Sequence, residues 1–104
     1  MRFGEVSCEL RSALVRRYAN TVTLTVRLHV RNGGRYPMNF GDGNFRLVLG
    51  DSARAPVGGL NEVLDGGTTR GGDVLFDLPL DARQAVLRAT FGDGVAEVPI
   101  RIHD

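Results

Sequence analysis

Three polar side chains that could bind an anion lie two residues apart in the sequence: Arg27, His29 and Arg31. In an extended strand, alternate side chains point to the same face, so the three would form one row with steps of about 6.7 Å. Guanidinium and imidazole groups in such a row suit the carboxylates or phosphates of a partner, and we take them as the candidate partner-binding residues. The alternative is a solvated sheet face, neutralised across strands by acidic residues: Glu5, Glu9, Asp73 and Asp77.

The sequence shows no arrangement of side chains typical of catalysis. His29 and His103 have no neighbouring nucleophile or acid in a motif, and no serine lies in a Gly-x-Ser-x-Gly turn. The single cysteine, Cys8, excludes a disulfide within the chain. It alternates in phase with Val6 and Leu10, so we expect a buried and unreactive thiol. We therefore predict a protein that is not an enzyme and that uses no cofactor.

Acidic and glycine residues cluster in turns, where they could be mistaken for ligand sites. Asp42-Gly43-Asn44 and Asp93-Gly94 each supply one carboxylate, fewer than a calcium loop needs. The glycine-rich stretch from Gly66 to Gly72 leads into a strand and lacks the lysine and helix of a phosphate-binding P-loop. A copper site from Met38, His29 and His103 is an alternative if a sandwich fold brings them together. We expect no metal site.

Composition and charge argue against several classes of protein. The chain has 104 residues, with 13 basic residues, all of them arginine, against 12 acidic ones, for a net charge of +1. A nucleic-acid or membrane-surface binder would need a larger positive excess. No apolar run approaches the roughly 18 residues of a membrane span. No hydrophobic stretch typical of a signal peptide follows Met1. The location stays open: cytoplasmic if Met1 is the native start, extracellular or periplasmic if an export segment was removed.

Alternation of apolar and polar residues predicts strands along most of the chain. From Val22 to Val30 every second residue is aliphatic and those between are polar, which is typical of a half-buried strand. Counting this run, the same pattern predicts seven short strands, at 5–11, 22–31, 35–40, 44–49, 73–78, 87–91 and 96–103. We expect strand 5–11 to run on into a loop before Tyr18. Twelve side chains should form the core: Val22, Leu24, Val26, Leu28, Val30, Phe45, Leu47, Phe76, Leu87, Phe91, Val98 and Ile100.

Turn residues separate these strands and suggest how they connect. Gly92-Asp93-Gly94 lies between two alternating runs and predicts a tight hairpin in which Asp93-Gly94 supplies the positive φ. Pro37 bars the 35–40 segment from the middle of a sheet and predicts an edge strand. About seven strands in one chain of this size predict an all-β fold, an antiparallel β-sandwich, as a single domain over residues 1–104.

From Val22 onward the sequence resembles a family of bacterial domains. The pattern comprises the strand 22–32 ending in Asn32, the segments 36–40 and 44–48, and the stretch 64–79, in which glycine turns precede Phe76-Asp77-Leu78-Pro79. The final strand, 97–102, also fits. This order is similar to that of the immunoprotective extracellular immunoglobulin-like domains of bacterial secreted proteins and lipoproteins, many of unknown function. The resemblance covers about 80 residues and implies an immunoglobulin-like sandwich.

The resemblance also implies a class of function. Members are mostly exported, and many are thought to be adhesive, antigenic or accessory modules; this chain lacks the signal peptide and lipobox common among them. We therefore expect a non-catalytic interaction or accessory module with a protein partner, or an edge-mediated homodimer, since open sheet edges can add a strand. The alternative is a carrier module for a small anion or a metal. Neither nucleic acid nor a membrane is an expected partner.

Overall fold

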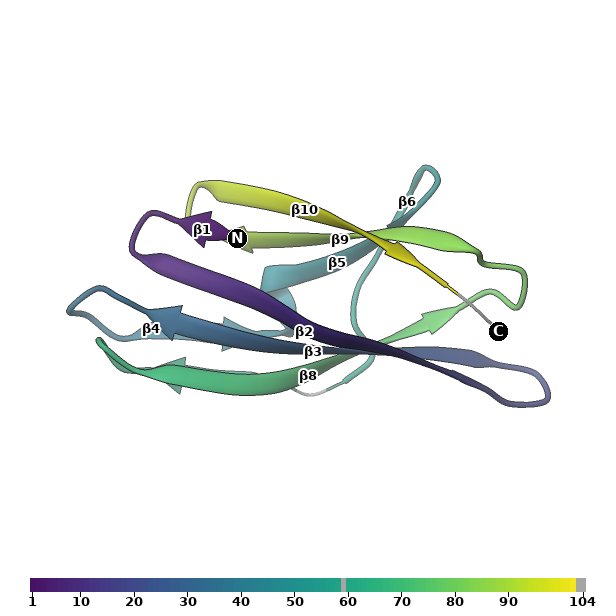
Figure 1. Cartoon of the computed structure of the whole chain (residues 1–104), viewed down its shortest axis with the longest axis horizontal. Coiled ribbons are helices and arrows are strands. Elements are labelled where there is room, and N and C mark those ends of the chain that lie inside the picture. Colours follow the sequence, from purple (N-terminus) through teal and green to yellow (C-terminus); the bar gives the residue numbers. More distant parts are fainter. Residues whose placement is uncertain (59, 103–104) are drawn as a thin grey trace.

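The computed structural model describes residues 1–58 and 60–102, which fold as an antiparallel β-structure (Figure 1). The strands are β1 (Arg2–Phe3), β2 (Val6–Arg17), β3 (Val22–Asn32), β4 (Met38–Gly41), β5 (Phe45–Leu49), β6 (Ser52–Arg54), β7 (Asn61–Leu64), β8 (Thr69–Leu78), β9 (Gln84–Phe91) and β10 (Gly94–Arg101), and a short 3-10 helix, η1, spans Asp42–Asn44. No helix in the described part of the chain is long and apolar enough to cross a membrane. The all-β prediction is confirmed.

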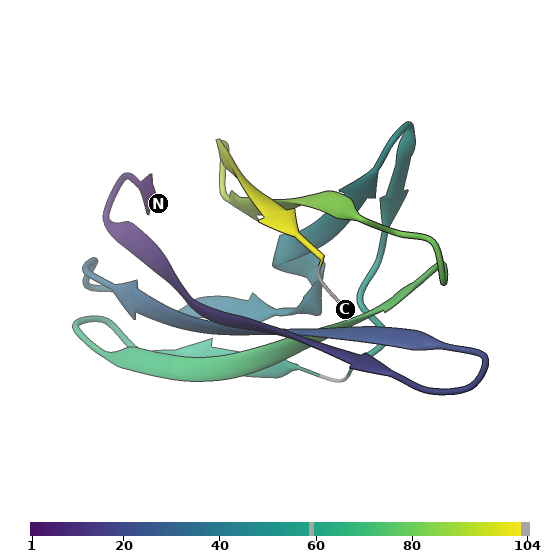
Figure 2. The ribbon, with the colours of Figure 1, turned by 45° about the vertical axis from the view of Figure 1, so that its right-hand side comes forward.

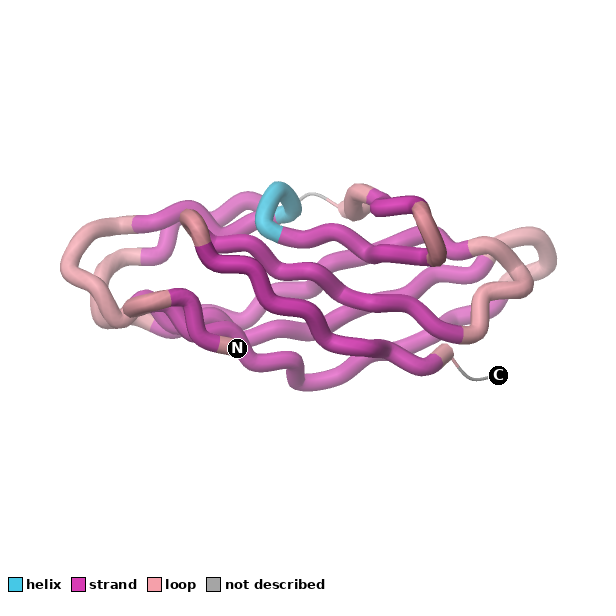
Figure 3. The backbone as a smooth tube through the Cα atoms, turned by 90° about the horizontal axis from the view of Figure 1, so that it is seen from above, coloured by secondary structure: helices cyan, strands magenta, loops and turns pink. Residues whose placement is uncertain are grey.

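Two four-stranded sheets face each other as the layers of a sandwich (Figure 2). The first sheet has the order β1-β2-β3-β8 and the second the order β10-β9-β5-β6, while β4 and β7 form a separate two-stranded ribbon. Every pairing is antiparallel. The molecule is elongated, 46 × 22 × 18 Å, with the long strands of both layers running lengthwise (Figure 3).

The core is formed by alternate side chains of the facing strands. Val22, Leu24, Val26, Leu28 and Val30 are all fully buried, as the period-2 pattern predicted. Phenylalanine rings join the layers through contacts with centroid separations between 5.0 and 6.2 Å, in the pairs Phe3–Phe91, Phe45–Phe91 and Phe40–Phe45. Eleven of the twelve predicted core residues are buried, and Val98, on β10 at the border of its sheet, is only partly buried.

One buried polar side chain, Asn32, ties the ribbon to the first sheet. Its amide nitrogen donates to the carbonyls of Tyr36 (2.8 Å) and Leu64 (3.0 Å), and its Oδ1 accepts from the Gly34 N–H (3.0 Å). The next residue, Gly33, donates its N–H to the Glu5 carbonyl at 2.8 Å. Since buried amides are costly when unpaired, these bonds fix the turn that leads to β4.

The structure departs from the sequence predictions in the number and extent of strands. The described residues form ten strands, three more than predicted, because β1, β6 and β7 are only two to four residues long and too short to show alternation. β2 continues to Arg17, where a loop was expected, because a bulge between Leu10 and Ser12 resets its register with β3. β8 begins at Thr69, so Gly71 and Gly72 lie within a strand and not in a loop. β4 begins after Pro37, at Met38.

The tight hairpin between β9 and β10 is present, but a different residue carries the positive φ. Phe91 pairs with Gly94, which leaves Gly92 and Asp93 as the two loop residues. Gly92 has φ 60°, whereas no residue other than glycine has a positive φ in the described chain. Glycine at the first central position is typical of a type II′ turn, so the prediction that Asp93-Gly94 supplies this conformation is wrong.

Candidate functional site

The predicted partner-binding residues lie on one face, as expected. β3 is an inner strand of the first sheet, with β2 on one side and β8 on the other. Because its alternate aliphatic residues fill the core, Arg27, His29 and Arg31 point away from it, on the outer face of that sheet. Arg27 and Arg31 are exposed and His29 is half-buried. Their electrostatic surroundings differ.

Arg27 is neutralised by a residue directly opposite on β8. The register places Asp73 beside it, and two hydrogen bonds join the pair, Nε to Oδ1 at 3.0 Å and a terminal guanidinium nitrogen to Oδ2 at 3.3 Å. The hydrogen bond to Arg27 lowers the pKa of Asp73, and the same bond raises the pKa of Arg27. Arg27 is therefore a paired cation, as expected of a solvated sheet face whose arginines are neutralised by acidic residues of a neighbouring strand.

Arg31, by contrast, stands in a row that contains no acid. Ser7 of β2 and Thr69 of β8 lie opposite it on either side, and Arg2 of β1 lies opposite Ser7. No described residue forms an ion pair with Arg31 or Arg2. Of the other acids expected to neutralise the row, Glu9 lies opposite His29 and pairs with Arg11 at 3.5 Å.

These side chains surround a shallow hollow of about 350 Å³, which we name the basic hollow. It is lined by three arginines, two hydroxyl groups, one histidine and one carboxylate, together with the start of the chain: Arg2, Arg11, Arg31, Ser7, Thr69, His29, Glu9, Met1 and Cys8. Gly71, opposite His29, leaves space for the ring, since a Cβ there would lie 3.1 Å from imidazole atoms. Guanidinium and hydroxyl donors in a concave site suit an acidic group.

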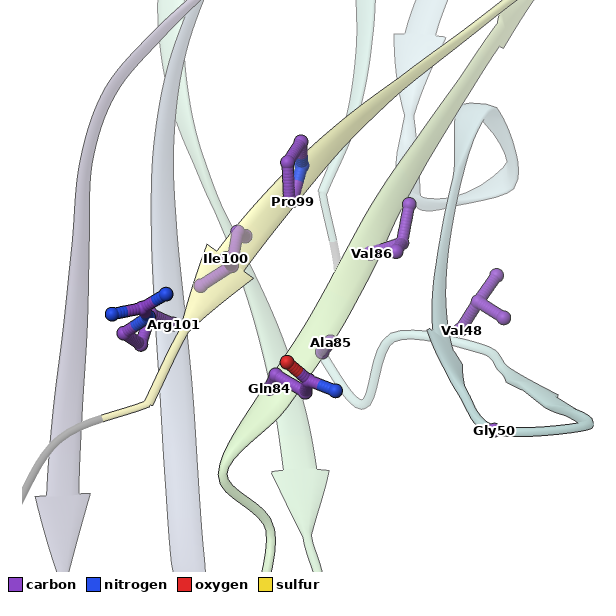
Figure 4. A pocket seen from close by; sticks show the side chains of 8 residues that line it. All are labelled: Val48, Gly50, Gln84, Ala85, Val86, Pro99, Ile100 and Arg101. Atoms are coloured by element: carbon purple, nitrogen blue, oxygen red, sulfur yellow. The ribbon is translucent and has the colours of Figure 1, made fainter.

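A second hollow, of about 480 Å³, lies on the second sheet and is largely apolar (Figure 4). Its floor is a cross-strand row of Val48 on β5, Val86 on β9 and Pro99 on β10. Gln84 and Arg101 stand at its rim. The sequence prediction missed this surface, although a signal was present: valine and proline occupy positions where the alternation calls for polar residues. The hollow suits an apolar side chain better than an anion.

The remaining candidate residues are separated in the structure. Cys8 is buried, and burial raises the pKa of its thiol to about 11. Among the described residues, no three histidine, cysteine, aspartate or glutamate side chains gather in a way that could hold a metal ion. Met38 and His29 line different hollows, and His103, the third residue of the copper alternative, lies outside the described residues.

Comparison with solved structures finds a similar fold in the Bacillus subtilis protein ycdA, described as a candidate lipoprotein. The TM-score is 0.74 with 16% sequence identity, and the match covers 92% of this chain and 36% of that chain. This chain thus spans about a third of the length of ycdA, and the likeness concerns the fold alone. Comparison with models of protein families gives no match, and comparison with curated proteins gives none.

Proposed function

We propose that this chain is a non-catalytic, immunoglobulin-like module that binds an acidic protein partner through the outer face of its first sheet. The observation that carries the proposal is the cation Arg31, which forms an ion pair with no described residue and lies beside Ser7, Thr69 and Arg2 in the basic hollow. Exposed arginines next to hydroxyl donors recognise carboxylate or phosphate groups by charge and by planar hydrogen bonding. Arg27 contributes less, because Asp73 already occupies its guanidinium.

The setting of the module fits an accessory role on an exported bacterial protein. The immunoglobulin-like resemblance of the sequence and the likeness of the fold to ycdA, described as a candidate lipoprotein, both support this placement. The apolar hollow on the opposite sheet adds a second contact surface that a protein partner could use and a small ion could not. Partner binding through sheet surfaces is common for sandwich folds, whose enzymatic uses depend on grafted sites.

The alternative, a carrier for a small anion, draws on the same hollow. A volume of about 350 Å³ falls within the usual range for small-ligand sites, roughly 300–1,000 Å³. A carrier should hold a free anion with several convergent donors, whereas a partner-binding face should need an acidic group attached to a longer chain. The two functions therefore differ in the ligand that binds.

Titration of the ¹⁵N-labelled protein with two probes separates these functions. Hexaglutamate peptide should shift the amide resonances of Ser7, His29, Arg31 and Thr69, and inorganic phosphate at equal concentration should shift them far less. Arg31→Glu should abolish the shifts, whereas the control Arg35→Glu, which changes an exposed arginine outside the hollow, should retain them. Equal or stronger binding of phosphate would favour the carrier. A lack of response to both probes would remove the basic hollow as a site.

A further inference from the structure

One row of side chains sets the outer face of the second sheet apart from that of the first. Directly opposite residues of neighbouring strands point to the same face, so each set of partners forms a row across a sheet. On the second sheet, one outward row is apolar on every strand, from β6 through β5 and β9 to β10: Ala53, Val48, Val86 and Pro99. Every other outward row that the described residues form on the two sheets includes a polar or charged side chain.

This row keeps its apolar surface accessible. Val48 and Val86 are half-buried and Pro99 is exposed, and the three side chains lie on neighbouring strands as the floor of the apolar hollow (Figure 4). A solvated sheet face carries polar residues at such positions, as Arg88 and Glu97 do one step along the same strands. Contiguous apolar surface of this kind is typical of a site where another molecule binds.

The size and shape of the hollow suit a large side chain that belongs to a longer chain. Its volume is about 480 Å³, and it is open to solvent on the outer face of the sheet. Sites for free small molecules enclose most of the ligand, roughly 70–90% of its surface. An open hollow encloses less, so its occupant needs further contacts along the surface of the protein. An aromatic residue fits best, since it offers roughly 150–250 Å² of surface and such residues anchor protein interfaces.

The charges around the hollow favour a carboxylate next to that aromatic residue. Arg101 stands at the rim, is exposed and forms an ion pair with no described residue. On the other side of the apolar row, Glu97 is already paired with Arg88 at 3.1 Å. Arg46, opposite Arg88, donates to main-chain carbonyls and pairs with no described acid. The face therefore carries an excess of positive charge, and Arg101 is the cation within reach of a ligand in the hollow.

A second copy of the chain fits this face poorly. Contact between the same face of two copies would place hollow against hollow, with no projecting side chain to fill either, and a void forfeits the contacts of the atoms that line it. Each copy would also bring Arg46, Arg88 and Arg101 against the single acid Glu97. Because two faces with a positive excess repel each other, a partner with the opposite charge is favoured.

We propose that the apolar hollow binds a segment of a partner protein in which an aromatic residue is followed by an acidic one. The ring packs over Val48, Val86 and Pro99, and the carboxylate meets Arg101. This second site goes beyond the proposed function, because it lies on the opposite sheet and selects its ligand by an apolar side chain and not by acidity alone. The module then holds two protein segments, one on each outer face.

The test uses a peptide with blocked ends, glycine-serine-tryptophan-glutamate-serine-glycine, titrated into the ¹⁵N-labelled full chain. The amide resonances of Val48, Gly50, Val86 and Arg101 should shift, and that of Arg31, in the basic hollow, should not. A peptide with serine in place of tryptophan should bind at least about tenfold more weakly, because the anchor is lost. One with lysine in place of glutamate should bind about fivefold more weakly, as expected of an exposed ion pair, and this difference should shrink at high salt.

Two variants with matched controls locate the site. Val86→Asp places a charge on the floor of the hollow and should abolish binding of the tryptophan peptide, whereas Leu14→Asp, at a half-exposed position on the first sheet, should not. Arg101→Glu, which leaves the floor intact, should reverse the charge preference, so that the lysine peptide binds more tightly than the glutamate peptide. Arg35→Glu, outside the hollow, should keep the original preference. The dispersion of the NMR spectrum shows that each variant is folded.

Several results would overturn the inference: no shifts at millimolar tryptophan peptide, equal binding of the serine peptide, or an unchanged charge preference in Arg101→Glu. Free indole-3-acetate that binds as tightly as the peptide would make the hollow a small-molecule site instead. Sedimentation showing an association that Val86→Asp removes would assign it to a second copy. The proposed function fails or stands separately, because Val86→Asp should retain the hexaglutamate response and Arg31→Glu should retain binding of the tryptophan peptide.

Discussion

Arg27 and Asp73 stand directly opposite each other on β3 and β8, and two hydrogen bonds of 3.0 and 3.3 Å hold the guanidinium against the carboxylate. Both side chains are substantially exposed, so solvent screens their attraction. The pairing nevertheless matters for recognition, because Asp73 neutralises Arg27 and leaves its charge less available to a partner. What remains for recognition is Arg31 and its neighbours.

Exchanging the two charges should separate their structural role from any role in binding. Arg27→Asp combined with Asp73→Arg should restore most of the small stability loss caused by either single change, because the cross-strand pair is rebuilt in reverse. None of these variants should weaken hexaglutamate binding as much as Arg31→Glu. Urea denaturation and the peptide titration measure the two effects. A larger binding loss in Arg27→Asp than in Arg31→Glu would contradict this division.

The same pair predicts a dependence of stability on acid. Because Arg27 lowers the pKa of Asp73 in the folded protein, the stabilisation is present at neutral pH and is lost as the pH falls through that lowered pKa. Asp73→Asn should therefore be less stable than the wild type at pH 7, and the difference should shrink towards pH 2. Urea midpoints across this range test the sign. A difference that grows on acidification would contradict it.

The contribution of Cys8 to stability should be lost at high pH, whereas that of Asp73 is lost at low pH. Burial raises its pKa from 9.0 to about 11, so the neutral thiol stabilises the fold below about pH 9, and this stabilisation is lost as the pH rises from about 9 to about 11. The loss amounts to roughly 2–3 kcal/mol at most. Cys8→Ala should lack this component, which the difference between the two denaturation curves isolates.

The same burial predicts slow chemistry at the thiol. A maleimide probe at pH 7 should label Cys8 slowly in the native protein and rapidly in denaturant, because reaction requires both access and a thiolate. Mass spectrometry of timed samples gives both rates. Equal rates in the two conditions would show that the strand around Cys8 opens freely.

Phe76 should be among the costliest core positions. It is fully buried, and Phe76→Ala should reduce the free energy of unfolding by about 3–5 kcal/mol, the sum of lost transfer energy and a cavity. Val95→Ala, at a site 60% exposed, is the control and should change stability by no more than about 0.5 kcal/mol. Similar unfolding midpoints for the two variants would contradict the assigned core.

Gly66 tests whether the glycine-rich stretch is needed for packing. A Cβ at Gly66 would lie 2.6 Å from the Gly34 carbonyl oxygen and 2.7 Å from the Arg35 carbonyl carbon, backbone atoms that cannot easily move. Gly66→Ala should therefore cost about 1–3 kcal/mol. Gly43→Ala, where a Cβ meets nothing within 4 Å, should cost far less. Thermal unfolding compares them, and equal midpoints would contradict the crowding argument.

The long strands and the core could be predicted because one face of each strand is buried. Burial of one face requires an apolar residue at every second position, as in Val22, Leu24 and Val26. The ribbon of β4 and β7 could be predicted only in part: an edge strand was expected at 35–40, whereas the four residues of β7, Asn61–Leu64, show too few alternations. Its attachment through Asn32 depends on three-dimensional contacts between distant segments.

The alignment of the candidate site residues in one row could be predicted, but the different neighbours of each residue could not. Spacing placed Arg27 and Arg31 on one face, yet only the register of β8 shows that Asp73 meets the first and Thr69 the second. The full length of β2 was hidden for a related reason. A bulge between Leu10 and Ser12 allows the strand to continue, and a bulge leaves little trace in a sequence pattern.

The hydrogen bonds around Asn32 have a consequence for the chemical ageing of the chain. Asn32-Gly33 is a dipeptide prone to deamidation, in which the glycine nitrogen attacks the side-chain carbonyl, ammonia leaves, and water opens the resulting succinimide to aspartate or isoaspartate. In the fold, that nitrogen is bonded to Glu5 and the departing amide to Tyr36 and Leu64, so the reaction waits for unfolding. The aspartate formed cannot donate to those carbonyls. We therefore expect deamidation of Asn32 to accumulate with the total time that the chain spends unfolded.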